Sequence, residues 1–465
     1  MNKNSNKNTN KVNNNLMISK VVTAVAAVLV IVISCVQLYV KWNSKTKAEY
    51  YMEHVNAGKE YMENECYVEA MHEFRSAELI RNDENVQVAI AECYLGLKDY
   101  ATFKTSAEQV QSVYGTNDRL YEDLAHYYSF MNDSYSQINT LHQGVLEYPD
   151  SQSLRVKYDA VKGEYTQAGF NVDQIISVGE NYMVVVMDNE VRVITGALAK
   201  VGDVGYDRVY DLSEDKCIAA VWKDTDMLFS AMVDGKLSYY DSRGYKRKSP
   251  EEDYTYLGAP RDGFALVQSE DGWGYINCKF DHIGEWFDDA TSFGGGMAAV
   301  KKDGKWAFVD SRFNYVTEFV YDDVIVDEFK CCSNSGVAFA KRDGGYAMIN
   351  VEGEIEREEL YISAKPFASA EDYAAVKTAD GWKLIDIKGE AIEEVECDEL
   401  CSSANGTAAI CNDGKWGYIG VDDGVYVEAA LEGATGVNKN GYAVIKKNNQ
   451  WMIIHFSRFQ VDQGL

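Results

Sequence analysis

Proline and basic side chains are both scarce in this chain. Only 4 of the 465 residues are proline, which excludes a collagen-like chain and proline-rich linkers. Lysine and arginine together number 45 against 73 aspartates and glutamates, a formal net charge of -28. Such a surface repels nucleic acid and anionic lipid, so neither is expected as the principal partner. A cationic or neutral partner remains open.

Patterns typical of enzymes are also missing. The sequence shows no serine, histidine and acid arrangement for nucleophilic catalysis, no paired zinc ligands and no phosphate-binding loop. The run Gly294-Gly295-Gly296 precedes an expected strand instead of a helix, so it lacks the context of a nucleotide site. The sequence therefore predicts a protein that is not an enzyme, although a glycosidase pair of carboxylates could be hidden among so many acids.

No cofactor or metal ion is expected. The ten cysteines show no fixed spacing, and we interpret them as small buried hydrophobic residues. Cys397 and Cys401 lack a second pair or a histidine to complete a zinc site, and no D-x-D-x-D-G run is present for calcium. Four histidines lack the spacing of metal ligands on one helix face: His54, His72, His126 and His142.

The first 42 residues predict a membrane anchor. Residues 1–20 are rich in asparagine and predict a disordered tail. Residues 21–42 are mainly apolar and, as a transmembrane helix, would span about 30 Å, the hydrocarbon thickness of a bilayer. A slight lysine excess before this run favours a cytoplasmic N-terminus with the bulk of the chain outside. The alternative is a lipoprotein anchored at Cys35, although the residues after Cys35 stay apolar.

Residues 45–165 carry a helical repeat. Its spacing is clearest in five residues: Gly58, Tyr61, Ala70, Phe74 and Ala77. In these residues the segment resembles the tetratricopeptide repeat, whose two antiparallel helices approach at small residues while Tyr61 and Phe74 fill the space beside them. Fainter copies follow near Val86 and Leu124. We expect a short helical solenoid that either grips a peptide in a groove or acts as a spacer.

Residues 170–465 repeat with a period of about 35 residues. Each clear copy has one central aromatic residue: Trp273, Trp306, Tyr346, Trp382, Trp416 and Trp451. Degenerate copies around Leu237 and Val191 raise the expected number of units to eight, or to seven if the Val191 copy only completes another unit. Regular spacing predicts that these aromatic residues are structural anchors packed between units, in preference to a platform for sugar rings.

Each copy predicts a β-hairpin. Alternating residues flank an Asp-Gly pair, as in residues 297–310, and Asp-Gly favours the type I′ turn. With a further strand, each unit has the strands of a propeller blade. Three segments resemble the WG (KWG) repeat family: Gly272-Trp273-Gly274, Lys305-Trp306 and Lys415-Trp416-Gly417. The resemblance implies a propeller-like β array, commonly at the bacterial surface or envelope, without shared catalytic residues.

The chain is thus predicted to be multidomain, with a transmembrane helix, a helical solenoid and an all-β propeller-like array. Closure would remove unpaired edges, with residues 451–454 pairing with strands near Ile175 and Ile176; the alternative is an open β-solenoid. For function we expect a membrane-tethered, non-catalytic scaffold of the bacterial envelope with protein or peptide partners. The alternative is binding or processing of cell-wall glycan.

Overall fold

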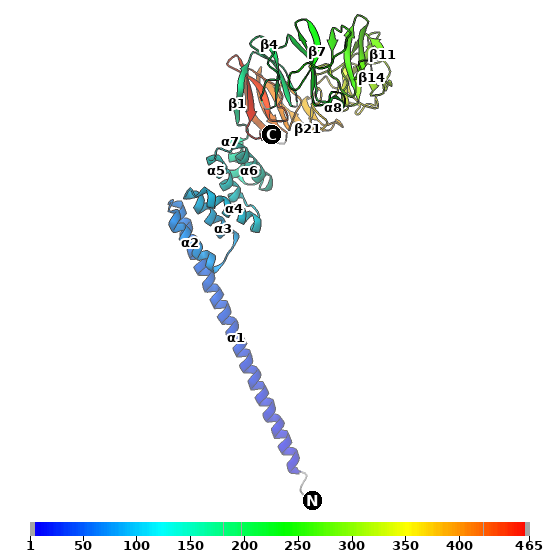
Figure 1. Cartoon of the computed structure of the whole chain (residues 1–465). Coiled ribbons are helices and arrows are strands. Elements are labelled where there is room, and N and C mark those ends of the chain that lie inside the picture. The colour runs from blue at the N-terminus through cyan, green and yellow to red at the C-terminus, as the bar shows by residue number, and fades with distance from the viewer. Residues whose placement is uncertain (1–4, 180, 197, 422, 461–465) are drawn as a thin grey trace. The chain divides into compact units, whose positions relative to one another are not determined.

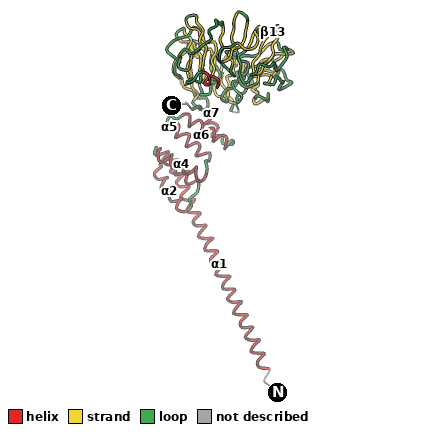
Figure 2. The backbone as a smooth tube through the Cα atoms, turned by 45° about the vertical axis from the view of Figure 1, so that its right-hand side comes forward, coloured by secondary structure: helices red, strands yellow, loops and turns green. Residues whose placement is uncertain are grey.

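The computed structural model describes residues 5–179, 181–196, 198–421 and 423–460. The chain divides into two compact units, Met1–Lys157 and Tyr158–Leu465. Helices form the first, called here the helical unit, and antiparallel sheets form most of the second, called the strand unit (Figures 1 and 2). The predicted order of a helical region followed by a many-stranded region is confirmed.

Helix α1 (Ser5–Glu63) contains an apolar stretch. From Val25 on it includes an 18-residue window of mean hydropathy 2.1, none of it buried, so it is long and apolar enough to cross a membrane; a signal sequence meets the same criterion. The predicted disordered tail over 1–20 differs from the structure, because residues 5–20 are helical and 1–4 lie outside the described part. No proline interrupts residues 5–63, so the helix extends into the asparagine-rich segment at a modest cost per residue.

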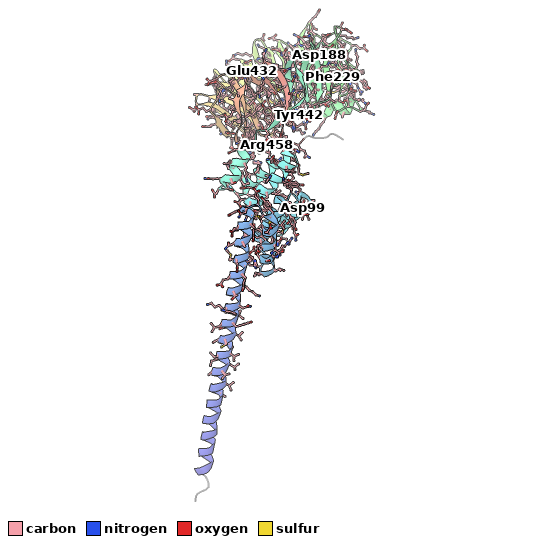
Figure 3. The ribbon with its side chains drawn as sticks, turned by 90° about the vertical axis from the view of Figure 1, so that its left-hand side faces the viewer. Asp99, Asp188, Phe229, Glu432, Tyr442 and Arg458 are labelled. Carbon is pink, nitrogen blue, oxygen red and sulfur yellow. The ribbon has the colours of Figure 1, made fainter. Side chains whose placement is uncertain are left out.

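Six shorter helices follow: α2 (Tyr67–Ile80), α3 (Glu84–Gly96), α4 (Tyr100–Tyr114), α5 (Asp118–Phe130), α6 (Ser134–Glu147) and α7 (Gln152–Val161). The side chains of Asp83, Asp99, Asn117 and Asp133 accept hydrogen bonds from the backbone N–H three residues later and so cap α3 to α6. Asp99 is labelled in Figure 3. Within the helical unit, α1 packs on α2, α3 on α4 and α5 on α6.

The strand unit contains eight antiparallel sheets in its described residues, separate from one another and not joined as a single closed sheet. Three have three strands each: β2 (Gln174–Val178), β3 (Tyr182–Met187) and β4 (Glu190–Thr195); β5 (Arg208–Ser213), β6 (Leu228–Val233) and β7 (Lys236–Asp241); β12 (Asp289–Ala290), β13 (Met297–Lys302) and β14 (Lys305–Asp310). A fourth of the same kind has β15 (Asp323–Val324), β16 (Val337–Arg342) and β17 (Gly345–Asn350).

The other four sheets have four strands each. They comprise β8 (Tyr256–Leu257), β9 (Phe264–Ser269), β10 (Gly272–Asn277) and β11 (His282–Phe287); β18 (Ser363–Ala364), β19 (Ala374–Thr378), β20 (Gly381–Ile385) and β21 (Ala391–Val395); β22 (Glu399–Leu400), β23 (Thr407–Asn412), β24 (Lys415–Gly420) and β25 (Gly424–Leu431); and β1 (Tyr165–Val172), β28 (Gln450–Phe456), β27 (Tyr442–Lys447) and β26 (Gly433–Ala434). A short helix, α8 (Lys216–Val221), lies between β5 and β6 in the chain, and is seen as the short red segment among the strands in Figure 2.

Asp-Gly pairs form the two-residue turns of four hairpins, at residues 234–235, 303–304, 343–344 and 413–414. Asp303 and Gly304 both have positive φ, 51° and 81°, as a type I′ turn requires, and they place Lys302 opposite Lys305. In the Trp273 and Trp382 copies this prediction is wrong, because Gly272 and Gly381 are the first residues of β10 and β20 and each loop lies one residue earlier. A Cβ on Gly272 would lie 2.6 Å from the Phe287 carbonyl oxygen, so the approach of β11 requires glycine there.

Strand β1 pairs with β28, with Tyr165 opposite Phe456 and Val172 opposite Trp451; in Figure 1 the teal β1 lies beside the red C-terminal strands. Residues 451–454 thus pair with a strand close to the predicted Ile175 and Ile176, but that strand ends at Val172 and does not contain either isoleucine. The helical region was expected to extend to Tyr165, whereas α7 ends at Val161 and the first strand begins at Tyr165. Ile175 belongs to β2 and pairs instead with β3.

Buried apolar clusters lie between successive sheets. One contains Phe308 of β14 and Ala338 of β16, and another contains Tyr239 of β7 and Val267 of β9. Equivalent clusters occur at the other boundaries between sheets that follow one another in the chain. A further cluster joins Val444 of β27 with Val185 of β3, so the last sheet also packs on the β2–β4 sheet.

Candidate functional site

The six predicted repeat anchors occupy equivalent positions. Each lies near the start of the second long strand of its hairpin, within β10, β14, β17, β20, β24 or β28. Trp306 and Trp382 are buried, with 6% and 5% exposure. The other four, Trp273, Tyr346, Trp416 and Trp451, are partly buried. All six pack against apolar clusters of the strand unit, as anchors between units should.

Lysine side chains cover most of these rings. Lys301 lies opposite Trp306 in the ladder, and its Nζ is 5.6 Å from the ring centroid. The same cross-strand pairing places a lysine over Tyr346, Trp382 and Trp451, and Lys330 lies over Trp273. A ring packed on its own sheet and covered by an ammonium group offers little free face to a sugar. This arrangement favours the structural role of the anchors.

Three tyrosines two residues beyond the anchor position tie neighbouring sheets together. The hydroxyls of Tyr239, Tyr275 and Tyr418 donate to the backbone carbonyls of Gly258, Thr291 and Thr435 at 2.7, 2.8 and 2.9 Å. All three side chains are fully buried, and each acceptor directly follows the first short strand of the next sheet, β8, β12 or β26. These bonds are not among the features predicted from the sequence, although the recurrence of tyrosine at one position of the repeat was a usable signal.

A second recurring device closes the turn after the anchor strand. Asp310 Oδ1 accepts hydrogen bonds from the backbone N–H groups of Arg312 and Asn314, both at 2.8 Å. Side chains at the same repeat position make the equivalent pair of bonds: Asp241, Asn277, Asn350 and Asp386. These Asx turns give a structural role to three aspartates of the array, Asp241, Asp310 and Asp386.

The strand unit also holds a buried ion pair. Asp211 of β5 is fully buried, and its Oδ1 lies 2.9 Å from Arg261 Nη2. The carboxylate also accepts bonds from the N–H groups of Leu212 and Ala259. Burial raises the pKa of Asp211 to about 6, while the Arg261 charge opposes this rise. With these partners, the pair links β5 to the loop between β8 and β9 and has the character of a structural tie.

In the helical unit the tetratricopeptide-like residues are partly as predicted. Ala70, Phe74 and Ala77 are buried, and a Cβ on Gly58 would lie 2.7 Å from the Phe74 ring. The small residue at 58 therefore allows the close approach of α1 and α2. Tyr61 differs from the predicted pattern, because its side chain near the end of α1 is 40% exposed.

Charged side chains connect the odd-numbered helices of the helical unit, each helix with the next: α1 with α3, α3 with α5, and α5 with α7. We call this set the charge ladder: Lys59 of α1, Glu92 of α3, Arg119, Glu122 and Asp123 of α5, and Lys157 of α7. Arg119 Nη2 binds both carboxylate oxygens of Glu92, and Lys157 Nζ binds Glu122. Lys59 attracts Glu92, which also hydrogen-bonds Asp123. These contacts connect α1, α3, α5 and α7.

The ladder combines exposed cations with sequestered carboxyl groups. The Arg119 and Lys157 side chains are 46% and 48% exposed, whereas that of Glu92 is only 10% exposed. Burial, and then the neighbouring Glu92, raises the pKa of Asp123 to about 8, and its Oδ2 is buried without a hydrogen-bond partner. Exposed members can exchange their present partners for the charges of a bound polypeptide. This makes the ladder the candidate binding site.

A metal-binding site was also sought among the residues that the structure describes. Within them, no group of three or more His, Cys, Asp or Glu side chains could hold a metal ion. The nearest histidine interaction is an ion pair, with His54 Nδ1 at 2.6 Å from Glu73 Oε2. It connects α1 to α2 and is one more contact within the helical unit.

The model of the WG containing repeat family matches residues 287–306, which end at the anchor Trp306. The chain therefore contains a WG repeat. No curated protein matches. Similar solved structures include PorZ, a surface component of the type-IX secretion system of Porphyromonas gingivalis, at 8% identity and a TM-score of 0.34. The match covers 61% of this chain and 42% of the PorZ chain.

Two further similar structures are matched over nearly their whole length. The AfRom2 CNH domain is 9% identical with a TM-score of 0.33, and the match covers 63% of this chain and 98% of that one. The uncharacterized protein lmo1340 of Listeria monocytogenes is 11% identical with a TM-score of 0.32, and the match covers 56% of this chain and 93% of that one.

Proposed function

We propose that this protein is a membrane-tethered, non-catalytic scaffold of the bacterial envelope that binds a protein partner through the charge ladder. The ladder is the single observation that carries the proposal. Its cations are half exposed, whereas the buried Asp211–Arg261 pair of the strand unit is enclosed. Charges that are paired but accessible suit recognition of a polypeptide carrying both signs of charge. We assign this role to the helical unit.

The helical unit is proposed to be a stack of tetratricopeptide-type repeats. Three observations support this: the pairs α1/α2, α3/α4 and α5/α6, the close packing at Gly58, and a terminal α7 that follows as a cap. In such stacks the first helices of successive pairs share one face, which is where the ladder residues originate.

The strand unit is proposed to be a closed propeller of eight blades, with the six aromatic anchors between blades. Support comes from the eight sheets, the buried clusters between successive sheets and the cluster that joins β27 to β3. The pairing of β1 with β28 gives the last blade a strand from the beginning of the unit. Together these contacts favour a closed ring over the open solenoid.

For the membrane we propose that α1 crosses once, with the N-terminus in the cytoplasm and the folded units outside. Cys35 lies inside the continuous helix Ser5–Glu63, which favours a spanning helix over a lipoprotein cleaved before Cys35. Protease added to intact cells should digest both units and spare the N-terminal segment. Protection of both units would overturn this orientation, and loss of attachment in Cys35→Ala would support the lipoprotein instead.

The binding role is tested by crosslinking in intact envelopes, followed by purification of the full chain. Protein partners recovered with the wild type should be lost with Arg119→Glu, which places a like charge beside Glu92. Arg75→Glu is the matched control, because the partners of Arg75 of α2 in the described residues, Glu78 and Tyr94, lie outside the ladder. Equal recovery from both variants contradicts the ladder as the site. Turnover of a wall glycan by the purified chain contradicts the non-enzymatic role.

A further inference from the structure

Two cysteines from neighbouring sheets of the strand unit lie against each other. Cys217 is in α8, which follows β5, and Cys278 comes directly after β10. Both side chains pack on the cluster between the β5–β7 and β8–β11 sheets. Their thiols are hydrogen-bonded to each other. The Cys278 thiol also donates to the Gly263 carbonyl at 3.5 Å, and Cys217 interacts with the same backbone group.

The backbone around both thiols is held in place by Asp215. Its Oδ1 accepts a hydrogen bond from the N–H of Cys217 at 2.7 Å and so caps α8. Its Oδ2 accepts one from the N–H of Asp262 at 3.2 Å, next to Gly263. One carboxylate therefore fixes Cys217 relative to the loop that contacts Cys278. Both cysteines are free and only partly buried, so a small oxidant can reach them.

We propose that Cys217 and Cys278 form a disulfide that crosslinks the second and third sheets of the strand unit when the chain meets a disulfide oxidant. Thiols in hydrogen-bond contact need only small side-chain rotations to reach bonding distance of about 2 Å. This inference goes beyond the proposed binding function and does not depend on it.

The order of the reaction follows from the hydrogen bond between the thiols. It lowers the pKa of Cys278 and raises that of Cys217, so Cys278 is the first thiolate. The Cys278 thiolate attacks one sulfur of the oxidant, whose S–S bond breaks and releases a thiol that takes the first proton. Cys217 then loses its proton and attacks Cys278 Sγ, releasing the second thiol with that proton. Two electrons pass from the cysteine pair to the oxidant.

The test uses the full chain in detergent, incubated with glutathione disulfide, alkylated, digested and mapped by mass spectrometry. We expect the Cys217 and Cys278 peptides to be joined with the loss of two hydrogen atoms, and to separate on reduction. Cys93 is the internal control, because burial raises its pKa to about 12 and it should remain a free thiol. Separate alkylation of Cys217 and Cys278 in the folded, oxidant-treated chain would overturn the proposal.

Single variants test the order of attack. In Cys217→Ser, Cys278 should retain glutathione as a stable mixed disulfide. In Cys278→Ser, the adduct on Cys217 should form several-fold more slowly, because burial and the neighbouring Asp215 still raise the pKa of that thiol. Equal rates would overturn the assignment of Cys278 as the first nucleophile. Far-UV circular dichroism checks folding, and alanine variants at the same positions replace any serine variant that does not fold.

Discussion

Glycine residues of the helical unit meet aromatic rings on neighbouring helices, whereas tyrosine hydroxyls of the strand unit reach backbone carbonyls of the next sheet. In the helical unit, a Cβ on Gly58 would lie 2.7 Å from Phe74, one on Gly96 2.3 Å from Tyr67 and one on Gly144 2.9 Å from Tyr121. In the strand unit, the corresponding contacts are hydrogen bonds from Tyr239, Tyr275 and Tyr418.

The difference shows two ways of repeating an interface. Helices approach each other along their sides, so one residue without a side chain sets their separation. Sheets approach through side chains, and a directed hydrogen bond to a fixed carbonyl adds alignment to apolar packing. Substitutions that enlarge a side chain should therefore destabilise the interfaces between helices most strongly. Substitutions that remove side-chain atoms should destabilise the interfaces between sheets most strongly.

Removal of an anchor ring should give the largest effect. Trp306→Ala empties space between the β12–β14 and β15–β17 sheets, where the ring is 6% exposed, and should lower the free energy of unfolding by about 3–5 kcal/mol. Denaturant unfolding, followed by the circular dichroism of the β-strands, measures this decrease in the free energy of unfolding. Trp273→Ala is the matched control, since that ring is only partly buried, and it should cost less. Equal costs would show that burial does not distinguish the anchors.

The charge ladder should make the helical unit sensitive to pH. The folded pKa of Asp123, about 8, is above its ordinary value, so between these values the folded chain holds a proton that the unfolded chain has released. Stability should therefore fall as pH rises from about 4 to 8, by up to about 1.4 kcal/mol per pH unit. Asp123→Asn should flatten this dependence in thermal unfolding followed at 222 nm. The exposed carboxylate variant Glu108→Gln should retain it.

Adding one methyl group between helices should have an intermediate effect. Gly58→Ala forces the new Cβ against Phe74 and should destabilise the helical unit by about 1–3 kcal/mol. The double variant Gly58→Ala/Phe74→Leu should recover part of this loss, because leucine lacks the ring that lies in the way. Without such recovery in denaturant unfolding, the Gly58–Phe74 contact does not set the helix separation.

Loss of a single hydroxyl should have the smallest effect. Tyr418→Phe removes the bond to Thr435 and should cost about 1–3 kcal/mol at most, because the carbonyl is left without its buried donor. Tyr346→Phe is the matched control, since its hydroxyl bonds the exposed side chain of Asp323, and its cost should be close to zero. Comparable losses of unfolding free energy would remove the special role of the tyrosines between sheets.

Much of the array could be predicted because its signals are local. An Asp-Gly pair and the alternation around it specify one hairpin, and the aromatic spacing repeats that hairpin along the chain. The pairing of β1 with β28 could not be predicted in the same way. Its strands are about 280 residues apart in the sequence, and Tyr165–Val172 contains neither a repeat aromatic residue nor an Asp-Gly turn.

Contacts within the candidate site were harder to predict. The position of Gly58 against Phe74 followed from repeat spacing, since both lie in one helical pair. The charge ladder draws one or more residues from each of four helices, and charged side chains carry no periodic signal for their partners. Asp211 and Arg261 look like ordinary surface residues in the sequence, and only the folded sheets reveal that Asp211 is enclosed.

The pairing of β1 with β28 also determines when during synthesis the strand unit can complete its folding. A ribosome releases Tyr165 long before Gln450, so β1 must wait without its partner while the intervening sheets emerge. If the chain crosses a membrane during synthesis, the same delay applies on the far side. Bringing such distant segments together is entropically costly and slows folding. The pairing of β1 with β28 is therefore the last step in completing the strand unit. A chain whose synthesis stops before β28 would keep β1 as an unpaired strand edge.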